Sequence, residues 1–156
     1  MKSITSILLL AAALAWSGAH AADTPSNLGP TVSERLTTAR AAIAAKDWSR
    51  ALSELNTAAR EEPRNAEVHN LLGYSHRKQA TPNLAKAFEH YRIALQIDPK
   101  HKGAHEYIGE AYLMNRQPAE AEKHLTTLEQ LCGSQTCEEY ADLARAIQDY
   151  RTKNPG

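Results

Sequence analysis

The sequence has no excess of either charge and little of what β-structure needs. Its 156 residues include 18 basic and 18 acidic side chains, without a long run of one sign. This balance gives no electrostatic reason to expect a nucleic acid or an anionic membrane surface as the partner. Only seven glycines are present, and no segment alternates β-branched with polar residues. The missing strand patterns predict an all-α protein, and the length predicts one domain.

Motifs that carry catalysis are also missing. The sequence contains no G-x-S-x-G turn, no phosphate-binding P-loop and no glycine-rich turn between a strand and a helix. Glu138 and Glu139 lie at the start of an expected helix, where carboxylates face the positive end of the helix dipole. We therefore expect no enzyme activity and no cofactor.

Long apolar runs are absent except near the N-terminus. Lys2, an apolar run over residues 7–16 and the sequence Ala-His-Ala at 19–21 have the layout of a secretory signal. The run is about ten residues long, whereas a membrane-spanning helix needs about twenty, so an uncleaved anchor is the weaker alternative. No cysteine lies near the cleavage site, which argues against a lipoprotein anchor. We predict a signal peptide over residues 1–21, a periplasmic or secreted bacterial protein without membrane insertion after cleavage, and a disordered leader over residues 22–32.

Repeated patterns follow this leader. Small residues recur at intervals of 34 and 36 residues, at Ala39, Gly73 and Gly109. After 12, 14 and 12 residues, a second apolar pattern begins at Ala51, Ala87 and Ala121. Both patterns have helical spacing, so each unit predicts two helices that face each other. We expect the helices of the third unit to be in contact through Gly109 and Ala121, and two extra residues in the turn around 80–83 of the second.

These units resemble the tetratricopeptide repeat (TPR), a 34-residue pair of helices. The pattern positions of the third unit are filled by His105, Ile108, Gly109, Tyr112, Ala121 and Leu125. Those of the second are filled by His69, Leu72, Gly73, His76, Ala87, Tyr91 and Pro99. The first unit matches best at its turn, residues 46–52. The resemblance covers residues 33–133 and implies a right-handed all-α solenoid of three hairpins, with an ordinary helical bundle as the alternative. The chain's ending also resembles small secreted proteobacterial TPR proteins, which suggests a location but no biochemical role.

Capping residues predict the helix boundaries. We expect helices over residues 33–45, 48–61, 66–79, 82–97, 102–115, 118–131 and 137–151. Asp47 and Asn65 can accept backbone N–H groups at the start of their helices. Thr81 followed by Pro82 predicts an N-cap and a first helical residue, and Pro118 predicts the same first position.

The last helix and two cysteines close the repeat array. Residues 134–156 are predicted to form a capping helix and tail, because one face is apolar at Tyr140, Leu143, Ile147 and Tyr150. Cys132 and Cys137 precede it, and so close a pair in an exported chain predicts a disulfide. A redox-active pair and a metal site are weaker alternatives, because the motif is not Cys-x-x-Cys. His124 lies about 12 Å from Cys132 along the helix, too far to share an ion.

Six histidines follow the expected signal peptide without forming a recognised metal motif. His69 and His105 are repeat equivalents, as are His90 and His124, so duplication and packing explain them. His101 and His105 are four residues apart and are the fallback metal ligands. They would serve the alternative function, a periplasmic metal-handling protein that uses surface histidines.

The resemblance implies that the first helices of the hairpins line a concave groove for a peptide or a partner helix. Helical spacing places exposed groove residues at Arg40, Asn70, Tyr74, Arg77, Glu106 and Glu110. This groove would be basic toward its N-terminal end and acidic toward its C-terminal end. The carboxylate-binding clamp of some TPR domains is not expected, because Leu36, Leu71 and Tyr107 stand where some of its polar residues belong. We therefore predict a periplasmic scaffold or adaptor that binds a protein or peptide and no nucleic acid.

Overall fold

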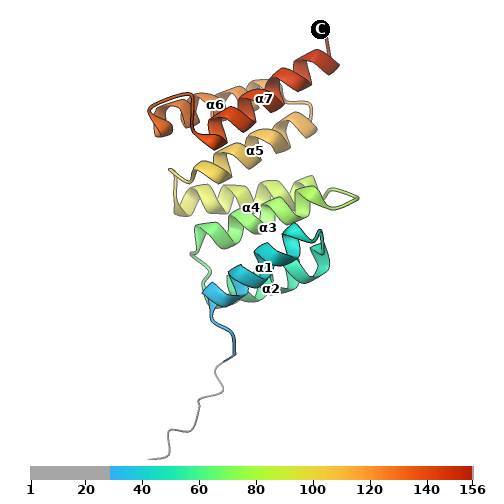
Figure 1. Cartoon of the computed structure of the whole chain (residues 1–156), viewed down its shortest axis with the longest axis vertical. Helices are drawn as coiled ribbons and strands as arrows, with labels where there is room; N and C mark the ends of the chain where they lie inside the picture. Colours follow the sequence, from blue (N-terminus) through green and yellow to red (C-terminus); the bar gives the residue numbers. More distant parts are fainter. Residues whose placement is uncertain (1–28, 156) are drawn as a thin grey trace, which may run out of the picture.

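The computed structural model describes residues 29–155, so the predicted signal peptide and most of the predicted leader lie outside the described residues. Within this range the chain forms only α-helices: α1 (Val32–Ala44), α2 (Trp48–Glu61), α3 (Ala66–Lys78), α4 (Leu84–Ile97), α5 (Lys102–Met114), α6 (Pro118–Cys132) and α7 (Glu138–Lys153). The hairpins α1–α2, α3–α4 and α5–α6 stack along one axis, and α7 packs on the last of them (Figure 1). The predicted all-α array of three hairpins and a closing helix is confirmed.

The stack has two layers of helices. The odd-numbered helices lie in one layer and the even-numbered helices in the other (Figure 1). Contacts between α3 and α5, and between α5 and α7, run along the odd-numbered layer. We call the surface formed by α1, α3, α5 and α7 the first-helix face. Helix α7 therefore stands where the first helix of a fourth hairpin would begin.

Side chains cap the starts of α1, α2 and α3, and the caps of α2 and α3 are the ones that the sequence predicts. Asp47 accepts the N–H of Arg50 at 3.0 Å, and Asn65 accepts that of Val68 at 3.1 Å. At the start of α1, Thr31 and Glu34 form a reciprocal capping box. This box begins the helix at Val32, one residue before the predicted boundary, and Val32 is buried in the core rather than part of a leader.

The start of α4 differs from the prediction. Asn83, not Thr81, is the N-cap: its side-chain oxygen accepts the N–H of Lys86 at 3.1 Å. The backbone N–H of Asn83 also bonds to the carbonyl of His76 at 2.9 Å, which holds the turn against the end of α3. Thr81 and Pro82 therefore lie in the turn. That turn spans residues 79–83, two more than the turns at 45–47 and 115–117, as predicted.

The buried glycines of α3 and α5 allow large side chains to approach. A Cβ atom on Gly73 would lie 2.5 Å from the ring of Tyr91 in α4. One on Gly109 would lie 2.6 Å from a methyl group of Leu143 in α7. The side chain nearest to Gly109 therefore comes from α7, a contact that the sequence did not predict. Leu143 lies closest because α7 packs against α5 and fills the space that a following hairpin would take.

Helix α7 closes the core with the predicted face. Leu143 and Ile147 are buried, and Tyr140 and Tyr150 pack beside them. Before α7, the structure brings Cys132 and Cys137 to disulfide distance, with their Cα atoms 6.1 Å apart. Over residues 29–155, no helix is both long and apolar enough to cross a membrane.

Candidate binding groove

Two hollows on the first-helix face lie between three successive first helices. The acidic hollow has a volume of about 310 Å³ and is lined by Glu67, Asn70, His101, Gly103, Glu106, Tyr107, Glu138, Glu139 and Asp142. The C-terminal hollow has a volume of about 360 Å³ and is lined by Arg77, Lys78, Glu110, Leu113, Met114, Ala146, Asp149, Tyr150, Lys153 and Asn154. The structure thus brings four predicted groove residues to these hollows, two to each: Asn70 and Glu106, then Arg77 and Glu110.

Arg77 is at the centre of this face, but it is not exposed. Only 4% of the residue is accessible. Its guanidinium forms an ion pair with Glu110 at 2.5 Å and donates to the Tyr91 hydroxyl at 3.2 Å. The rings of Tyr74 and Tyr107 flank it, with centroids 5.5 and 5.6 Å from the guanidinium carbon. Arg77 is therefore a structural cross-link between α3, α4 and α5.

The charge pattern predicted for the groove changes accordingly. Arg40, the other predicted basic residue, forms an ion pair with Glu67 at 2.7 Å. Each predicted groove arginine is thus paired with a carboxylate of the next first helix, which neutralises the expected basic end. All six groove residues were predicted to be exposed, and this was wrong for Asn70, Arg77 and Glu106, which are buried. Neighbouring first helices pack side by side and cover them.

Glu67 joins three hairpins at the edge of the acidic hollow. Besides Arg40, it accepts hydrogen bonds from Asn70 at 3.2 Å and from His101 at 3.1 Å. Burial alone would raise the pKa of Glu67, but the hydrogen bonds from His101, Asn70 and Arg40 bring it below its usual value. The hydrogen bond to Glu67 in turn raises the pKa of His101.

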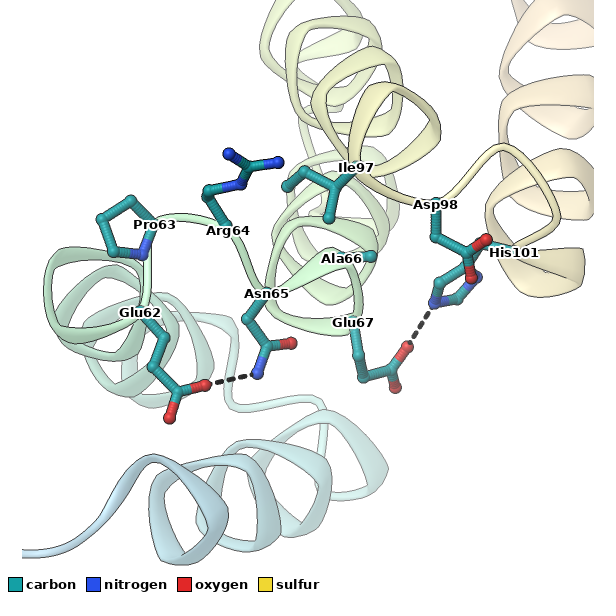
Figure 2. Close-up of a pocket in the computed structure, with 9 residues that line it drawn as sticks. All are labelled: Glu62, Pro63, Arg64, Asn65, Ala66, Glu67, Ile97, Asp98 and His101. Carbon is teal, nitrogen blue, oxygen red and sulfur yellow. Dashed lines mark hydrogen bonds and ion pairs between the residues drawn. The ribbon is translucent and has the colours of Figure 1, made fainter.

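A larger hollow lies outside the groove. It has a volume of about 750 Å³ and lies between the α2–α3 turn and the α4–α5 turn. Figure 2 shows two pairs among its polar side chains, Glu62 with Asn65 and Glu67 with His101, whereas Arg64 and Asp98 have no partner among the residues drawn. The two pairs connect neighbouring hairpins.

Glu106, on the wall of the acidic hollow, has no partner within residues 29–155. It is 8% exposed, and its carboxyl makes neither a hydrogen bond nor an ion pair with the described residues. Burial, together with the nearby carboxylates of Glu110, Asp142 and Glu139, raises the pKa of Glu106 to about 8. Ionisation of a buried carboxyl group that has no partner destabilises the fold.

Asn70 has a second unmatched group in the same hollow. The residue is 3% exposed, and its side-chain carbonyl oxygen has no hydrogen-bond partner in the described part of the chain. Its amide already donates to Glu67. Gly103 faces this amide: a Cβ there would lie 3.3 Å from the Asn70 side-chain nitrogen. A glycine at this position keeps the hollow open beside Asn70.

The repeat-equivalent histidines form pairs inside the hairpins. The Nδ1 atoms of His69 and His90 are 3.2 Å apart, and those of His105 and His124 are 2.8 Å apart. The Nε2 atoms of His69 and His105 each lie 3.0 Å from a backbone carbonyl, of Pro63 and Pro99, so these nitrogens carry the protons. Their Nδ1 atoms then accept from His90 and His124. The sequence predicted the equivalence and the packing but missed the pairing.

This pairing separates the fallback metal ligands. His105 bonds to His124, whereas His101 bonds to Glu67 and caps α5 by accepting the N–H of Ala104. His69 and His105 are buried rather than on the surface. Among residues 29–155, the only three side chains with metal-ligand spacing are Cys132, Cys137 and Glu139, and the two cysteines are bonded to each other.

Sequence reasoning missed the contribution of α7 to the groove. It predicted this helix as a cap and Glu138 and Glu139 as acids of its first turn, whereas both residues and Asp142 also line the acidic hollow. The order of helices was a usable signal, because a helix after a hairpin packs where the next first helix would stand. Nothing in the sequence around Glu67 predicted that this residue would connect three hairpins.

Comparisons with known proteins agree with this geometry. Residues 36–102 match the family described as tetratricopeptide repeat. A complex of the TPR2B domain of yeast Sti1 with pHsp70 has a similar fold, with a TM-score of 0.69 and 13% identity, covering 79% of this chain and 98% of that one. The Sgt2 TPR domain from Aspergillus fumigatus has a TM-score of 0.68 and 19% identity, covering 80% and 84%. No curated protein sequence matches the chain. The described chain thus has the fold of a TPR domain, and its residues 36–102 match the tetratricopeptide repeat family.

Proposed function

We propose that this protein acts by binding: it is a protein–protein interaction module that holds a peptide or a partner helix on the first-helix face. One observation carries the proposal. The acidic hollow and the C-terminal hollow are both lined by α3, α5 and α7, so three successive first helices offer adjoining sites for one elongated ligand. Similar TPR domains include one solved in complex with pHsp70.

The exposed side chains around the two hollows also suit a polypeptide ligand. Tyr74 and Tyr107 lie in contact, 4.8 Å between ring centroids, and both remain partly exposed. Met114, 46% exposed, adds an apolar surface in the C-terminal hollow. Aromatic and methionine side chains are typical of protein-binding surfaces, since they bury a large area with few polar groups to desolvate.

We further propose that the protein works in the bacterial periplasm. Two features support this location. The N-terminal residues have the layout of a signal peptide, and Cys132 and Cys137 lie at disulfide distance, which suits an oxidising compartment.

Site-specific crosslinking tests the binding surface. A photoreactive p-benzoylphenylalanine placed at Met114 should crosslink the partner in cells that express the full chain. The same group at Lys123, on α6 and exposed on the opposite layer, is the matched control. Crosslinks from position 114 that are absent from position 123 are the expected result. Crosslinks from position 123 alone would show that the partner binds the even-numbered helices instead.

A further inference from the structure

The strongest unexplained feature of the first-helix face is the acidic hollow. Some of its carboxylates have ordinary roles in the fold. Glu67 is bonded to Arg40, Asn70 and His101, and Asp142 is paired with Arg145 one turn along α7. Glu138 and Glu139 occupy the first turn of α7, where the helix dipole favours negative charge. None of these reasons applies to Glu106, in the fifth position of α5.

Two buried groups in this hollow lack the partners that a stable fold normally supplies. The Asn70 carbonyl oxygen is a fully buried acceptor without a donor, and the carboxyl of Glu106, a residue only 8% exposed, also has no partner among residues 29–155. Buried acceptors without donors are rare in folded proteins, and each one destabilises the structure. A ligand that brings several N–H donors and a positive charge would satisfy both.

The hollow suits a cationic side chain better than a metal ion. Among the described residues, only Cys132, Cys137 and Glu139 have ligand atoms close enough together to hold a metal, and this group contains a single carboxylate. The volume of about 310 Å³ is at the lower end of the roughly 300–1,000 Å³ typical of small-ligand sites. This volume suits a single long side chain, whose methylene groups can pack on the ring of Tyr107.

We propose that the acidic hollow binds a lysine or arginine side chain of the protein partner, through the Glu106 carboxylate and the Asn70 carbonyl oxygen. This inference rests on the proposed function, and it specifies that the segment of the partner that binds here is basic. The rest of that segment then runs along α3, α5 and α7 toward the C-terminal hollow.

Peptide titrations test this assignment. The probes are a fluorescein-labelled dodecapeptide that alternates lysine and alanine, and the same peptide with every lysine acetylated. Binding is measured by fluorescence anisotropy at low ionic strength and about pH 8, where Glu106 is substantially ionised. The lysine peptide should bind and the acetylated peptide should not, because acetylation removes the charge and keeps the length.

Two variants distinguish the hollow from the general negative surface. Glu106→Gln should weaken binding of the lysine peptide about tenfold, since it removes the carboxylate partner of the cation. Glu129→Gln makes the same change at an exposed carboxylate on α6, outside both hollows, and it should change the affinity by less than about twofold. Equal affinities for both variants would overturn the inference.

Amide chemical shifts separate this inference from the proposed function. With ¹⁵N-labelled protein, the lysine peptide should shift amides around Asn70, Gly103 and Glu106. Shifts confined to the C-terminal hollow around Met114 would overturn the lysine site and leave the first-helix face as the binding surface. Shifts confined to α2, α4 and α6 would count against both.

Discussion

Arg77 and Glu106 are two charged residues on one face with opposite situations. Both are more than nine-tenths buried. Arg77 has an ion pair with Glu110, a hydrogen bond to Tyr91 and aromatic rings on its flanks, whereas Glu106 has no partner among residues 29–155. Arg77 therefore stabilises the fold, whereas Glu106 destabilises it unless a ligand provides a partner for its carboxyl group. Substitutions at the two positions should therefore shift stability in opposite directions.

Glu106→Gln should make the protein more stable at alkaline pH. The folded-state pKa of Glu106 is raised to about 8 from 4.5, by burial and by Glu110, Asp142 and Glu139, against the weaker opposing charge of Arg77. The folded protein therefore holds this proton more tightly than the unfolded chain does. The resulting stability is fully present below pH 4.5 and is lost as pH rises through about 8.

Glutamine resembles the protonated acid and has no such loss. Near pH 9 the variant should gain free energy of unfolding on the order of 2 kcal/mol over the parent, with little difference near pH 5. Urea unfolding at both pH values measures the gain, and Asp149→Asn serves as the exposed control. A difference between Glu106→Gln and the parent that is the same at both pH values would contradict the pKa assignment.

Arg77→Met should destabilise the protein strongly. The substitution keeps much of the side-chain volume but leaves Glu110 and the Tyr91 hydroxyl without their partner, a loss on the order of 3 kcal/mol. Arg40→Met is the matched control, because the ion pair of Arg40 with Glu67 is half exposed and contributes less than about 1 kcal/mol. Thermal unfolding followed by circular dichroism compares them. Similar midpoints for the two variants would show that Arg77 is not a cross-link.

At the scale of helices, the glycines of α3 and α5 differ in what they face. The ring of Tyr91 against Gly73 is rigid, fully buried and bonded to Arg77. The methyl groups of Leu143 against Gly109 belong to an equally buried side chain, but they can move by rotation about its χ angles. Alanine is favoured over glycine in a helix interior by about 1 kcal/mol, so the outcome depends on whether the neighbour can move.

Gly73→Ala should therefore lower stability by about 1–3 kcal/mol, whereas Gly109→Ala should leave it nearly unchanged. Gly109→Leu should lose about 1–3 kcal/mol or more, because the larger side chain forces α7 away from α5. Chemical denaturation of the three variants gives the ranking. A parent-like midpoint for Gly109→Leu would refute the close packing of α5 and α7.

The link between α6 and α7 depends on the two cysteines. We expect protein exported to an oxidising compartment to contain a disulfide between Cys132 and Cys137. Peptide mass spectrometry without reduction should recover the linked pair. Replacing both residues with serine should reduce the free energy of unfolding by about 2 kcal/mol, as expected for a short closed loop. Two alkylatable thiols in freshly exported protein would disprove the bond.

At the scale of the whole molecule, local patterns predicted the fold well. The intervals between Ala39, Gly73 and Gly109 predicted three hairpins, and the spacing from Gly73 to Ala87 predicted the longer turn. Such signals are readable because helical periodicity and turn length depend on residues close in the chain. The start of α4 was harder to predict, because Thr81 and Asn83 can both act as an N-cap. Only the hydrogen bonds of Asn83 in the folded chain show which residue does so.

The candidate site was less predictable than the fold. Periodicity placed Asn70, Arg77 and Glu106 on the correct face of their helices but gave them the wrong environment. Whether such a side chain is exposed depends on how closely the next first helix packs, and that distance is a property of the stack. The contacts of Arg77 with Glu110 and of Arg40 with Glu67 each join successive first helices, between residues that lie far apart in the chain.

The sequence by itself determined the all-α class, the three repeats, most helix caps and the apolar face of α7. These depend on spacings within one or two helices, where a residue's neighbours in space are also its neighbours in the chain. Only the tertiary structure decided which charges are paired, which histidines meet, and that α7 forms a wall of the groove. Those outcomes depend on contacts between hairpins, and the side chains of Glu106 and Asn70 became unmatched acceptors only when three first helices packed around them.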